Sequence, residues 1–286
     1  MIGAYICGWT AFKVKCIGNM EKIIARYRYS GILLRELVRT DFKLRYQGSV
    51  LGYLWSLLRP LFLFLILYVV FVRFLKVGNN IPHYPVYLLL GIVLWNYFNE
   101  ITTGSVASVV SKGDLIRKIN FPKYVIVLAG CMSAFINLLL NAVVIAAFMV
   151  ISGVAIGWDA LWSIPLILEL TVFAVAIGFF LSALFVKFRD VAYIWEVLMQ
   201  AAFYATPILY PVAVLPLAAQ KILLLNPVAQ VIQDARHVLV TRQAIRLVDV
   251  YAIWSVILVP LGIVIVVSVF SVIYFRKSSK NFAEEV

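Results

Sequence analysis

The longest uncharged stretch of this chain constrains its fold more than any other feature. From Tyr124 to Trp158 there is no Asp, Glu, Lys or Arg, and Val, Ile, Leu, Ala and Phe dominate the run. A helix needs only about 20 apolar residues to cross the roughly 30 Å hydrocarbon core of a bilayer. Because lipid offers no hydrogen-bond partners, a single segment satisfies its own backbone there only as a helix. The stretch therefore predicts a membrane-spanning helix.

The rest of the chain repeats this pattern. Hydrophobic residues make up 64% of the sequence and charged residues only 13%, with a mean hydropathy of +1.00. A soluble domain cannot hide that much apolar surface in one core, because much of any globular surface faces water. We therefore predict an all-α integral membrane protein with six transmembrane helices in a domain over residues 51–275. The expected spans are about 51–71, 84–110, part of 124–158, 161–186, 191–209 and 250–275. The Arg59-Pro60 pair is expected to interrupt the first span near its cytoplasmic end.

The basic residues predict how these helices are oriented. Lys and Arg gather before the first span, after the second and fourth spans, and behind the last one, eighteen in all. Only six lie in the segments on the other side, namely Arg73, Lys76, Lys221, Arg236, Arg242 and Arg246. Cytoplasmic segments carry an excess of Lys and Arg, so segments 1–50 and 276–286 are both expected in the cytoplasm. The net charge of +12 could also suggest nucleic-acid binding. The basic residues form no continuous stripe interleaved with aromatics, however, so the pattern favours contact with anionic membrane lipids and no nucleic acid.

The N-terminal segment contains an expected amphipathic helix. Apolar residues recur there at helical spacing, at Leu34, Leu37, Val38 and Phe42, with charged residues between them. This pattern is typical of a helix that lies along the membrane interface. Two roles fit it equally well, a positively charged anchor in the lipid surface and a surface that binds a partner protein.

A short mixed segment separates the second and third expected spans. Asp114 can begin a helix of one or two turns, and Pro122 ends it before the next span. Between them, apolar residues are interspersed with basic ones. An ordinary positively charged loop fits this composition, and so does a transverse helix that docks in a groove of a cytoplasmic partner.

The segment between the fifth and sixth expected spans, residues 207–249, is interrupted by prolines. They lie at Pro207, Pro211, Pro216 and Pro227 and separate apolar pieces too short to cross a bilayer. The segment is nevertheless more apolar than a surface loop normally is. Because irregular backbone at membrane depth must be buried or line a cavity, we expect two short re-entrant helices on the outer side.

Several short motifs follow one another in a recognisable order and spacing. They are Arg45-Tyr-Gln-Gly-Ser-Val-Leu-Gly-Tyr-Leu-Trp-Ser-Leu-Leu-Arg-Pro60, Leu90-Gly-Ile-Val-Leu-Trp-Asn-Tyr-Phe98, Ile116-Arg-Lys-Ile-Asn-Phe-Pro122, Phe188-Arg-Asp190, Thr206-Pro-Ile-Leu-Tyr210 and Leu225-Asn-Pro227. Over residues 30–286 they resemble the permease subunits of the ABC-2 family in bacterial polysaccharide exporters, closest to the O-antigen type. Residues 1–25 lie outside the resemblance.

The resemblance implies a function and a set of partners. It implies a homodimer of six-span permeases in the bacterial inner membrane, each bound to a separate nucleotide-binding ATPase subunit. The cargo would be a polysaccharide on an undecaprenyl diphosphate lipid, moved to the periplasmic side. Residues 113–121 would form a coupling helix, the N-terminal helix a second ATPase contact, and residues 207–230 a periplasmic gate. The coupling residues would be Asp114, Leu115, Ile116, Arg117, Lys118 and Ile119.

The sequence also indicates what the chain leaves to its partner. No GxxxxGK[ST] loop occurs in these 286 residues, so we expect ATP and Mg on the ATPase subunit and no cofactor on this chain. The three cysteines form no CxxC pair, and no metal site is predicted. A membrane-embedded enzyme acting on an isoprenoid-linked sugar is the alternative, but the only histidines are His83 and His237, both in expected outer segments, and no two Asp residues stand at catalytic spacing. Capsule, teichoic acid or drug export are further alternatives within the family.

Some polar and aromatic residues inside the expected spans invite a functional interpretation. Arg59 could reach the cytoplasmic lipid headgroups, or it could bind a lipid diphosphate. Asn137 and Asn141 lie one turn apart and are expected to join helices, and Glu100, Glu169 and Glu196 to face neighbouring helices. Aromatic rings could form interfacial belts or line a sugar-conducting channel. The candidates for the channel are Trp95, Tyr97, Phe98, Tyr204 and Tyr210.

Overall fold

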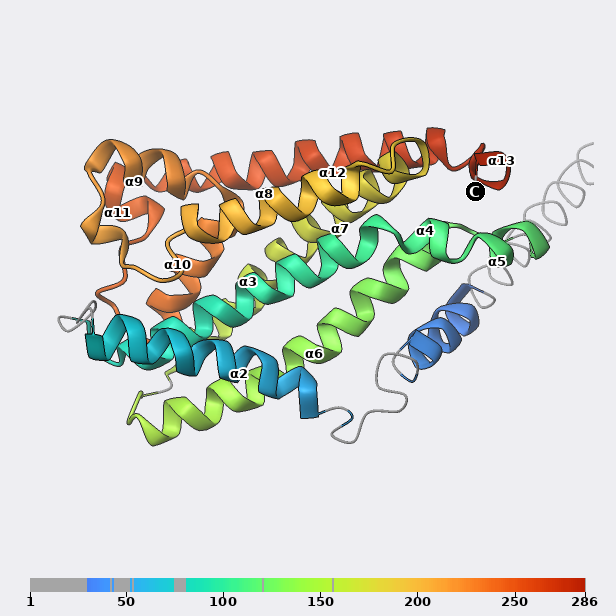
Figure 1. The fold of residues 1–286 in the computed structure, drawn as a ribbon. Coiled ribbons are helices and arrows are strands. Elements are labelled where there is room, and N and C mark those ends of the chain that lie inside the picture. Colours follow the sequence, from blue (N-terminus) through green and yellow to red (C-terminus); the bar gives the residue numbers. More distant parts are fainter. Residues whose placement is uncertain are drawn as a thin grey trace, which may run out of the picture.

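The computed structural model describes residues 30–41, 43, 52, 54–74, 81–119, 121–155 and 157–285. Across these residues every regular element is a helix, which confirms the all-α fold class. The longest helices run roughly along one common axis (Figure 1). Much of the predicted N-terminal segment, residues 1–29, 42 and 44–50, lies outside the described residues.

Among the described residues, four helices are long and apolar enough to cross a membrane, and at most 33% of the most apolar window of each is buried. The first joins α2 (Leu54–Tyr68) to a π-helical end, η1 (Val69–Phe74). The second is α6 (Tyr124–Ile151). The third joins η2 (Trp158–Trp162) to α7 (Ser163–Lys187), and the fourth joins η4 (Trp254–Ile257) to α12 (Leu258–Ser278). Most of their apolar surface faces outward, as expected for helices surrounded by lipid.

Helix α3 (Tyr84–Val106) is the central helix and differs from these four. It is buried continuously from Val86 to Trp95 and packs against α6 and α7. Because neighbouring helices shield it, α3 can carry polar residues that would be costly in a helix facing lipid. It ends at Val106 and, after Ala107, the short α4 (Ser108–Ser111) follows. The span expected over 84–110 is therefore two helices.

Helix α8 (Val191–Ala205) is a shorter apolar helix than the expected 191–209. It stops because Thr206, the residue before Pro207, has extended backbone angles. A proline ring clashes with the preceding residue in the α region, so helices commonly end there. Within α8 only Val191 is buried, which leaves nearly the whole helix exposed on the single chain.

The last membrane helix begins later than the expected residue 250. Residues Leu247–Tyr251 form the separate short helix α11, which ends at Ala252. Ala252 has a φ of 54°, in the left-handed region, and Ile253 is extended. These two residues redirect the chain, so the apolar helix starts only at Trp254. The apolar run alone did not reveal this break, because Ala252 and Ile253 are themselves apolar.

The segment after α8 forms a helical cap at one end of the protein (Figure 1). It consists of η3 (Val212–Val214), α9 (Leu217–Leu224), α10 (Pro227–Leu239) and α11. Helix α10 begins where Asn226 Oδ1 accepts a hydrogen bond from the Val228 N–H at 3.0 Å, with Pro227 in the first turn. The re-entrant segment expected over 207–230 thus contains η3, α9 and the start of α10, and α10 continues to Leu239.

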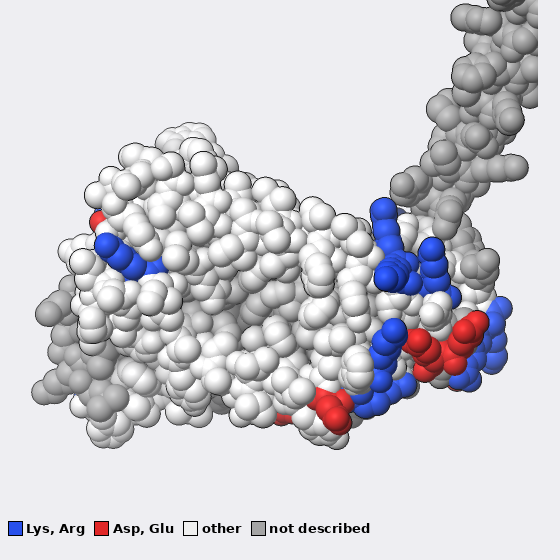
Figure 2. Space-filling view, turned by 90° about the horizontal axis from the view of Figure 1, so that it is seen from above, with Lys and Arg blue, Asp and Glu red and all other residues white. Residues whose placement is uncertain are grey.

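Charged side chains gather at the two ends of the protein. Figure 2 shows Lys, Arg, Asp and Glu mainly at the end that carries the C-terminus, a few at the opposite end, and a broad uncharged surface between them. The first end holds the helix over residues 30–41, α5 (Gly113–Lys118) and α13 (Phe282–Glu285), and the other holds α9 to α11. An uncharged band between two charged ends is the surface expected of a multi-pass membrane protein.

Candidate functional site

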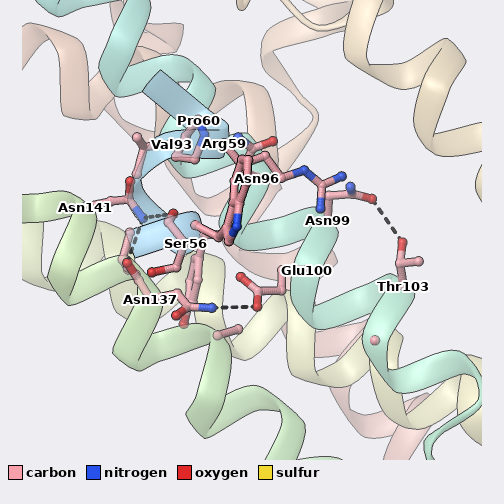
Figure 3. Close-up of a pocket in the computed structure, with 15 residues that line it drawn as sticks. Ser56, Arg59, Pro60, Val93, Asn96, Asn99, Glu100, Thr103, Asn137 and Asn141 are labelled. Atoms are coloured by element: carbon pink, nitrogen blue, oxygen red, sulfur yellow. Dashed lines mark hydrogen bonds between the residues drawn. The ribbon is translucent and has the colours of Figure 1, made fainter. Parts of the chain in front are cut away.

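A polar pocket lies between α2, α3 and α6 (Figure 3). Its volume is about 510 Å³, and it is bounded by the first turns of α2, the second half of α3 and the middle of α6. In Figure 1, α2 starts near the middle of α6 and runs toward the cap, so the pocket lies away from both ends of the bundle. The side chains that line it include Trp55, Arg59, Asn96, Asn99, Glu100, Thr103, Asn137 and Asn141. Their amide, hydroxyl, carboxylate and guanidinium groups are unusual among helices of this composition.

Pro60 explains why one of the asparagines points into the pocket. Proline has no N–H, so the helix interior loses the hydrogen bond to the carbonyl four residues earlier, which belongs to Ser56. Asn141 Nδ2 lies 3.5 Å from this Ser56 oxygen and 2.8 Å from the carbonyl oxygen of Asn137. The sequence predicted that Pro60 interrupts the first span, but α2 continues through it. The amide of Asn141 on α6 supplies a replacement donor across the helix interface.

Asn137 connects α6 to the carboxylate on α3. Its Nδ2 donates to Glu100 Oε1 at 2.8 Å, which fits the expectation that these residues join helices. The opposite atom of the same amide, Oδ1, is buried and has no hydrogen-bond partner. A buried acceptor without a partner is destabilising by about 1–3 kcal/mol. An unpaired amide oxygen at the wall of a polar pocket is suited to accept a hydrogen bond from a ligand.

Arg59 lines the same pocket and is exposed. Among the residues that the structure describes, no hydrogen bond or ion pair engages its guanidinium. A guanidinium offers five N–H donors in a planar fork that matches phosphate oxygens. Among its described lining residues, the pocket therefore combines the Arg59 cation, the Glu100 carboxylate bound to Asn137, and several neutral donors and acceptors. That combination suits a ligand with both phosphate and hydroxyl groups.

The aromatic candidates on α3 pack inside the single chain. Trp95 and Phe98 are 4% and 3% exposed; Trp95 packs against Phe203, and Phe98 stacks on Phe173. Tyr97 is also buried, its hydroxyl lies 2.8 Å from Thr171 Oγ1, and its ring reaches the pocket. In this arrangement Trp95 and Phe98 contribute to the core. Their channel-lining role stays a prediction.

The aromatic candidates near the end of α8 lie in a different environment. Tyr210 donates from its hydroxyl to the carbonyl oxygens of Tyr204 and Ala205 at 3.2 and 3.1 Å and so closes the end of the helix. Tyr204 is 68% exposed. It ends a row of exposed polar residues at intervals of three and four, namely Tyr193, Glu196, Gln200 and Tyr204. Such spacing places all four on one face of α8, a feature the sequence analysis did not recognise.

The predicted coupling residues form α5 and its last flanking position. Helix α5 spans Gly113–Lys118, and Ile119 is extended; residue 120 lies outside the described part. Asp114 lies in the first turn and Arg117 and Lys118 in the last, the distribution that the helix dipole favours. Ile116 is buried, Leu115 is half-buried, and Asp114, Arg117, Lys118 and Ile119 are exposed. The segment thus presents a mixed surface at the charged end of the protein.

Two further segments pack around α5. The helix over residues 30–41 buries Leu37 against the start of α6, with Leu115 alongside, and Lys112 Nζ contacts Asp41 Oδ1 at 2.7 Å. On the other side α13 lies against α5, and Phe282 is fully buried. Lys123 Nζ donates to the carbonyl oxygen of Ser279 at 2.6 Å, and burial lowers the pKa of this ammonium. The helix over residues 30–41 and α13 therefore both pack around the short helix α5.

The cap contains a buried cation that the sequence analysis placed in an outer loop. Arg236 on α10 is 0% exposed. Its guanidinium donates to the carbonyl oxygens of Tyr87 at 3.0 Å and of Pro207 and Ile208 at 2.7 Å, and it lies 3.8 Å from the Tyr87 ring centre. These bonds join α10 to α3 and to the turn that follows α8. The Asn226-Pro227 start of α10 was visible in the sequence, but the partners of Arg236 are distant in sequence.

Comparison with known proteins covers most of the chain. Residues 32–240 match the family described as ABC-2 type transporter. An O-antigen export system permease protein RfbA of Klebsiella pneumoniae is 34% identical over 206 residues, which cover 72% of this chain and 79% of the relative. A second protein of that name from Klebsiella pneumoniae is 33% identical over 205 residues, 71% and 78% of the two chains. One from Myxococcus xanthus is 32% identical over 208 residues, 70% and 77%.

Proposed function

The chain belongs to the ABC-2 type transporter family, and from this we propose that it is the membrane permease subunit of an ATP-driven polysaccharide exporter. The cargo is an O-antigen-like polysaccharide carried on undecaprenyl diphosphate, moved across the bacterial inner membrane. The observation that carries the proposal is the match, over most of both chains, to relatives named O-antigen export permeases. The polar pocket inside an otherwise apolar helix bundle supports it, because a polar cargo needs polar contacts at membrane depth.

Six membrane spans follow when α3 and α8 are added to the four apolar helices. Helix α3 is long enough to cross, and it is more polar because other helices surround it. Helix α8 rises about 22 Å at 1.5 Å per residue, and the turn after it continues into the cap. With both termini in the cytoplasm, the cap is periplasmic and α5 is cytoplasmic. The excess of basic residues at the α5 end supports this orientation.

A separate ATPase subunit would bind at the cytoplasmic end. Helix α5 and the helix over residues 30–41 lie together there, so one partner could contact both. No phosphate-binding loop occurs in the given sequence, so the partner holds ATP and Mg. Nucleotide binding would act by favouring one permease conformation over another. The exposed side chains of Arg117 and Lys118 suit an acidic groove.

A second copy of the chain would complete the conduit. Helix α8 is almost wholly exposed and carries the polar row Tyr193, Glu196, Gln200 and Tyr204. A carboxylate and an amide facing lipid are costly, whereas the same groups are tolerated along a water-filled path between subunits. Dimerisation through the α8 face would place this row beside a polymer. The segment over 207–230 would then act as the periplasmic gate.

The polar pocket would hold the lipid diphosphate and the first sugars. Arg59 would bind the phosphates, and Asn137 and the neighbouring amides would contact sugar hydroxyls. The contacts between amides and sugar hydroxyls are uncharged and weak enough to release a polymer that must move on.

Deleting the gene in the native host tests the proposal. Lipid-linked polysaccharide is measured on the two sides of the inner membrane, and the natural chain is returned on a plasmid as the control. We expect long polymer to accumulate in the cytoplasm while its surface form is lost, with both effects reversed by the plasmid. Unchanged surface polysaccharide would exclude this cargo and favour another one of the ABC-2 family. Loss of polymer synthesis itself would favour the enzyme alternative.

A further inference from the structure

A second cleft opens between a different set of helices, on the outer half of the protein. It has a volume of about 780 Å³ and lies between the first turns of α7, helix α10 and the first turns of α12. Its walls include Leu168 and Val172 from α7 and Leu261 and Ile265 from α12, all of them exposed. Both wall helices are apolar enough to cross a membrane. The cleft therefore opens sideways, toward the acyl chains of the outer leaflet.

The floor of this cleft is polar and offers only hydrogen-bond acceptors. Glu169 comes from α7, and Gln230 and Asp234 come from α10. Gln230 is 1% exposed; its Nε2 donates to Asp234 Oδ2 at 2.6 Å, while its Oε1 has no partner. Within the described part of the chain, no Lys or Arg forms an ion pair with Glu169 or Asp234. Among the described residues, two carboxylates without an ion pair and one buried amide oxygen without a partner thus line the same space, while the two arginines of the cleft, Arg242 and Arg246, pair with Asp159 and Asp249.

These three acceptors indicate which chemical group in a ligand would pair with them. Carboxylates inside a membrane are costly unless a cation pairs with them. A primary ammonium carries one positive charge and three N–H donors, one for each acceptor on the floor. A quaternary ammonium has the same charge but no donor, so it would leave the Gln230 oxygen unpaired.

The outer rim of the cleft suits a phosphate. Arg242 pairs with Asp159, and Arg246 donates to Asp249 from Nε at 3.3 Å and from Nη2 at 3.1 Å; because a guanidinium carries five N–H donors, both arginines keep further donors for a phosphate. Trp162 and Trp254 also line the rim and are exposed, as tryptophans at the headgroup level commonly are. From the start of α7 to Val172 the wall rises about 14 Å, close to half of the hydrocarbon core. A phosphate at the rim, an ammonium at the floor and an acyl chain along the walls are three parts of one amphiphilic molecule.

We propose that this cleft binds a phospholipid of the ethanolamine class from the outer leaflet. Its ammonium contacts Glu169, Gln230 and Asp234, its phosphate lies near Arg242 and Arg246, and one acyl chain follows the apolar walls between α7 and α12. The site is independent of the transported cargo and of the pocket that contains Arg59. It would tie the cap, through α10, to the membrane around it.

Lipid binding to the purified full-length chain tests the proposal without any transport assay. The chain is titrated in detergent with phosphatidylethanolamine and with its mono-, di- and trimethylated forms, and bound lipid is measured by native mass spectrometry. Removing the donors one by one should weaken binding progressively, to about tenfold for the trimethylated form, the size of one or two charged hydrogen bonds. Equal binding of all four lipids would overturn the proposal.

Variants locate the site. The double variant Glu169→Gln and Asp234→Asn should abolish the preference for the ethanolamine lipid, whereas Asp190→Asn, an exposed acid at the far end of α8, should retain it. Preference that survives in a folded, monodisperse double variant would place the lipid elsewhere and contradict the assignment. Phosphoethanolamine without acyl chains should fail to displace the lipid, because the walls contribute to binding. Displacement by this soluble compound would instead identify a site for small amines and overturn the lipid assignment.

Discussion

The Arg236 cluster in the cap and the Arg59 pocket among the membrane helices place similar groups in opposite situations. In the cap, a fully buried guanidinium donates to the backbone carbonyls of Tyr87, Pro207 and Ile208. In the pocket, an exposed guanidinium has no partner among the described residues, and the Oδ1 of Asn137 is buried and unpaired. The first arrangement is complete within the chain. The second leaves donors and acceptors for something else to satisfy.

This difference separates structural polar groups from binding ones by their hydrogen bonds. Both sets lie in an apolar protein, where an unpaired polar group is costly. A satisfied cluster gains nothing from a ligand, so its loss should lower stability. Polar groups that lack partners in the pocket contribute little to the stability of the fold. Replacing them should therefore lower transport and leave the fold intact. The following four predictions test that separation, from the largest expected effect on stability to the smallest.

Arg236→Met should be the most destabilising of these changes. Methionine keeps the apolar stem of the side chain but removes the charged hydrogen bonds to the carbonyls of Tyr87, Pro207 and Ile208, at about 1.5–3 kcal/mol each. We expect the free energy of unfolding, measured by denaturant titration in micelles, to fall by about 3 kcal/mol or more. Arg242→Met, which removes an exposed ion pair, should cost less than about 1 kcal/mol. Similar losses of unfolding free energy in the two variants would show that the buried hydrogen bonds stabilise the protein no more than an exposed ion pair does.

Gly91→Ala should destabilise the same cluster by overpacking. A Cβ at this position would overlap Nη2 and Cζ of Arg236, and we expect a loss of about 1–3 kcal/mol. Gly130→Ala on α6 meets no atom within 4 Å and should be neutral or slightly stabilising. The loss should shrink when Gly91→Ala is combined with Arg236→Met, because the clash is gone. An undiminished loss in the double variant would mean that Gly91 has another role.

Asn137→Leu should separate stability from transport in the pocket. It removes an unpaired buried oxygen, which favours the fold, and the hydrogen bond to Glu100, which disfavours it; because the two effects oppose each other, the free energy of unfolding should change by no more than about 1 kcal/mol. Export, measured as surface polysaccharide in the complemented deletion strain, should fall severalfold. Ser271→Ala on α12 removes another buried oxygen without a partner, away from the pocket, and should preserve export. If both variants export normally, Asn137 serves only to join helices.

Arg59→Gln should have the smallest effect on stability. The side chain is exposed and without an ion pair among the described residues, so the free energy of unfolding should stay within about 0.5 kcal/mol of that of the natural chain. Export should still fall, since the charge that would meet the lipid diphosphate is lost. Arg73→Gln, an exposed arginine in η1 outside the pocket, provides the matched control. Equal export by both variants would assign Arg59 to the lipid interface.

The sequence predicted the features that depend on the length of its apolar runs. The long apolar runs became α2, α6, α7 and α12, whereas the span expected over 191–209 ends earlier, before the Thr206-Pro207 step. The break between α11 and the last membrane helix could not be predicted from the sequence. Ala252 and Ile253 redirect the chain there, and both residues are apolar. At Pro60 the sequence predicted an interruption that the structure does not have. The Asn141 amide on α6 donates to the Ser56 carbonyl, and helix α2 stays continuous.

The polar contacts depended on how the helices rotate against one another, which no local pattern encodes. Glu100 and Asn137 were each expected to face a neighbour, but their pairing at 2.8 Å follows from the packing of α3 on α6. Arg236 was counted among outer-loop residues because its partners are 28 to 149 positions away in sequence. Trp95 and Phe98 were candidates for a channel lining beside an interfacial role, and their packing against Phe203 of α8 and Phe173 of α7 could not be predicted from the sequence.

The docking of α13 has a practical consequence for anyone handling this protein. Phe282, only a few residues from the end of the chain, is fully enclosed and packs against Phe275 and near Lys123. An affinity handle or fluorescent fusion attached directly behind it would pull on the helix that touches α5. A fused protein could thus silence ATP-dependent motion while the chain remained well folded and easy to purify. A long flexible spacer before any such fusion is therefore advisable.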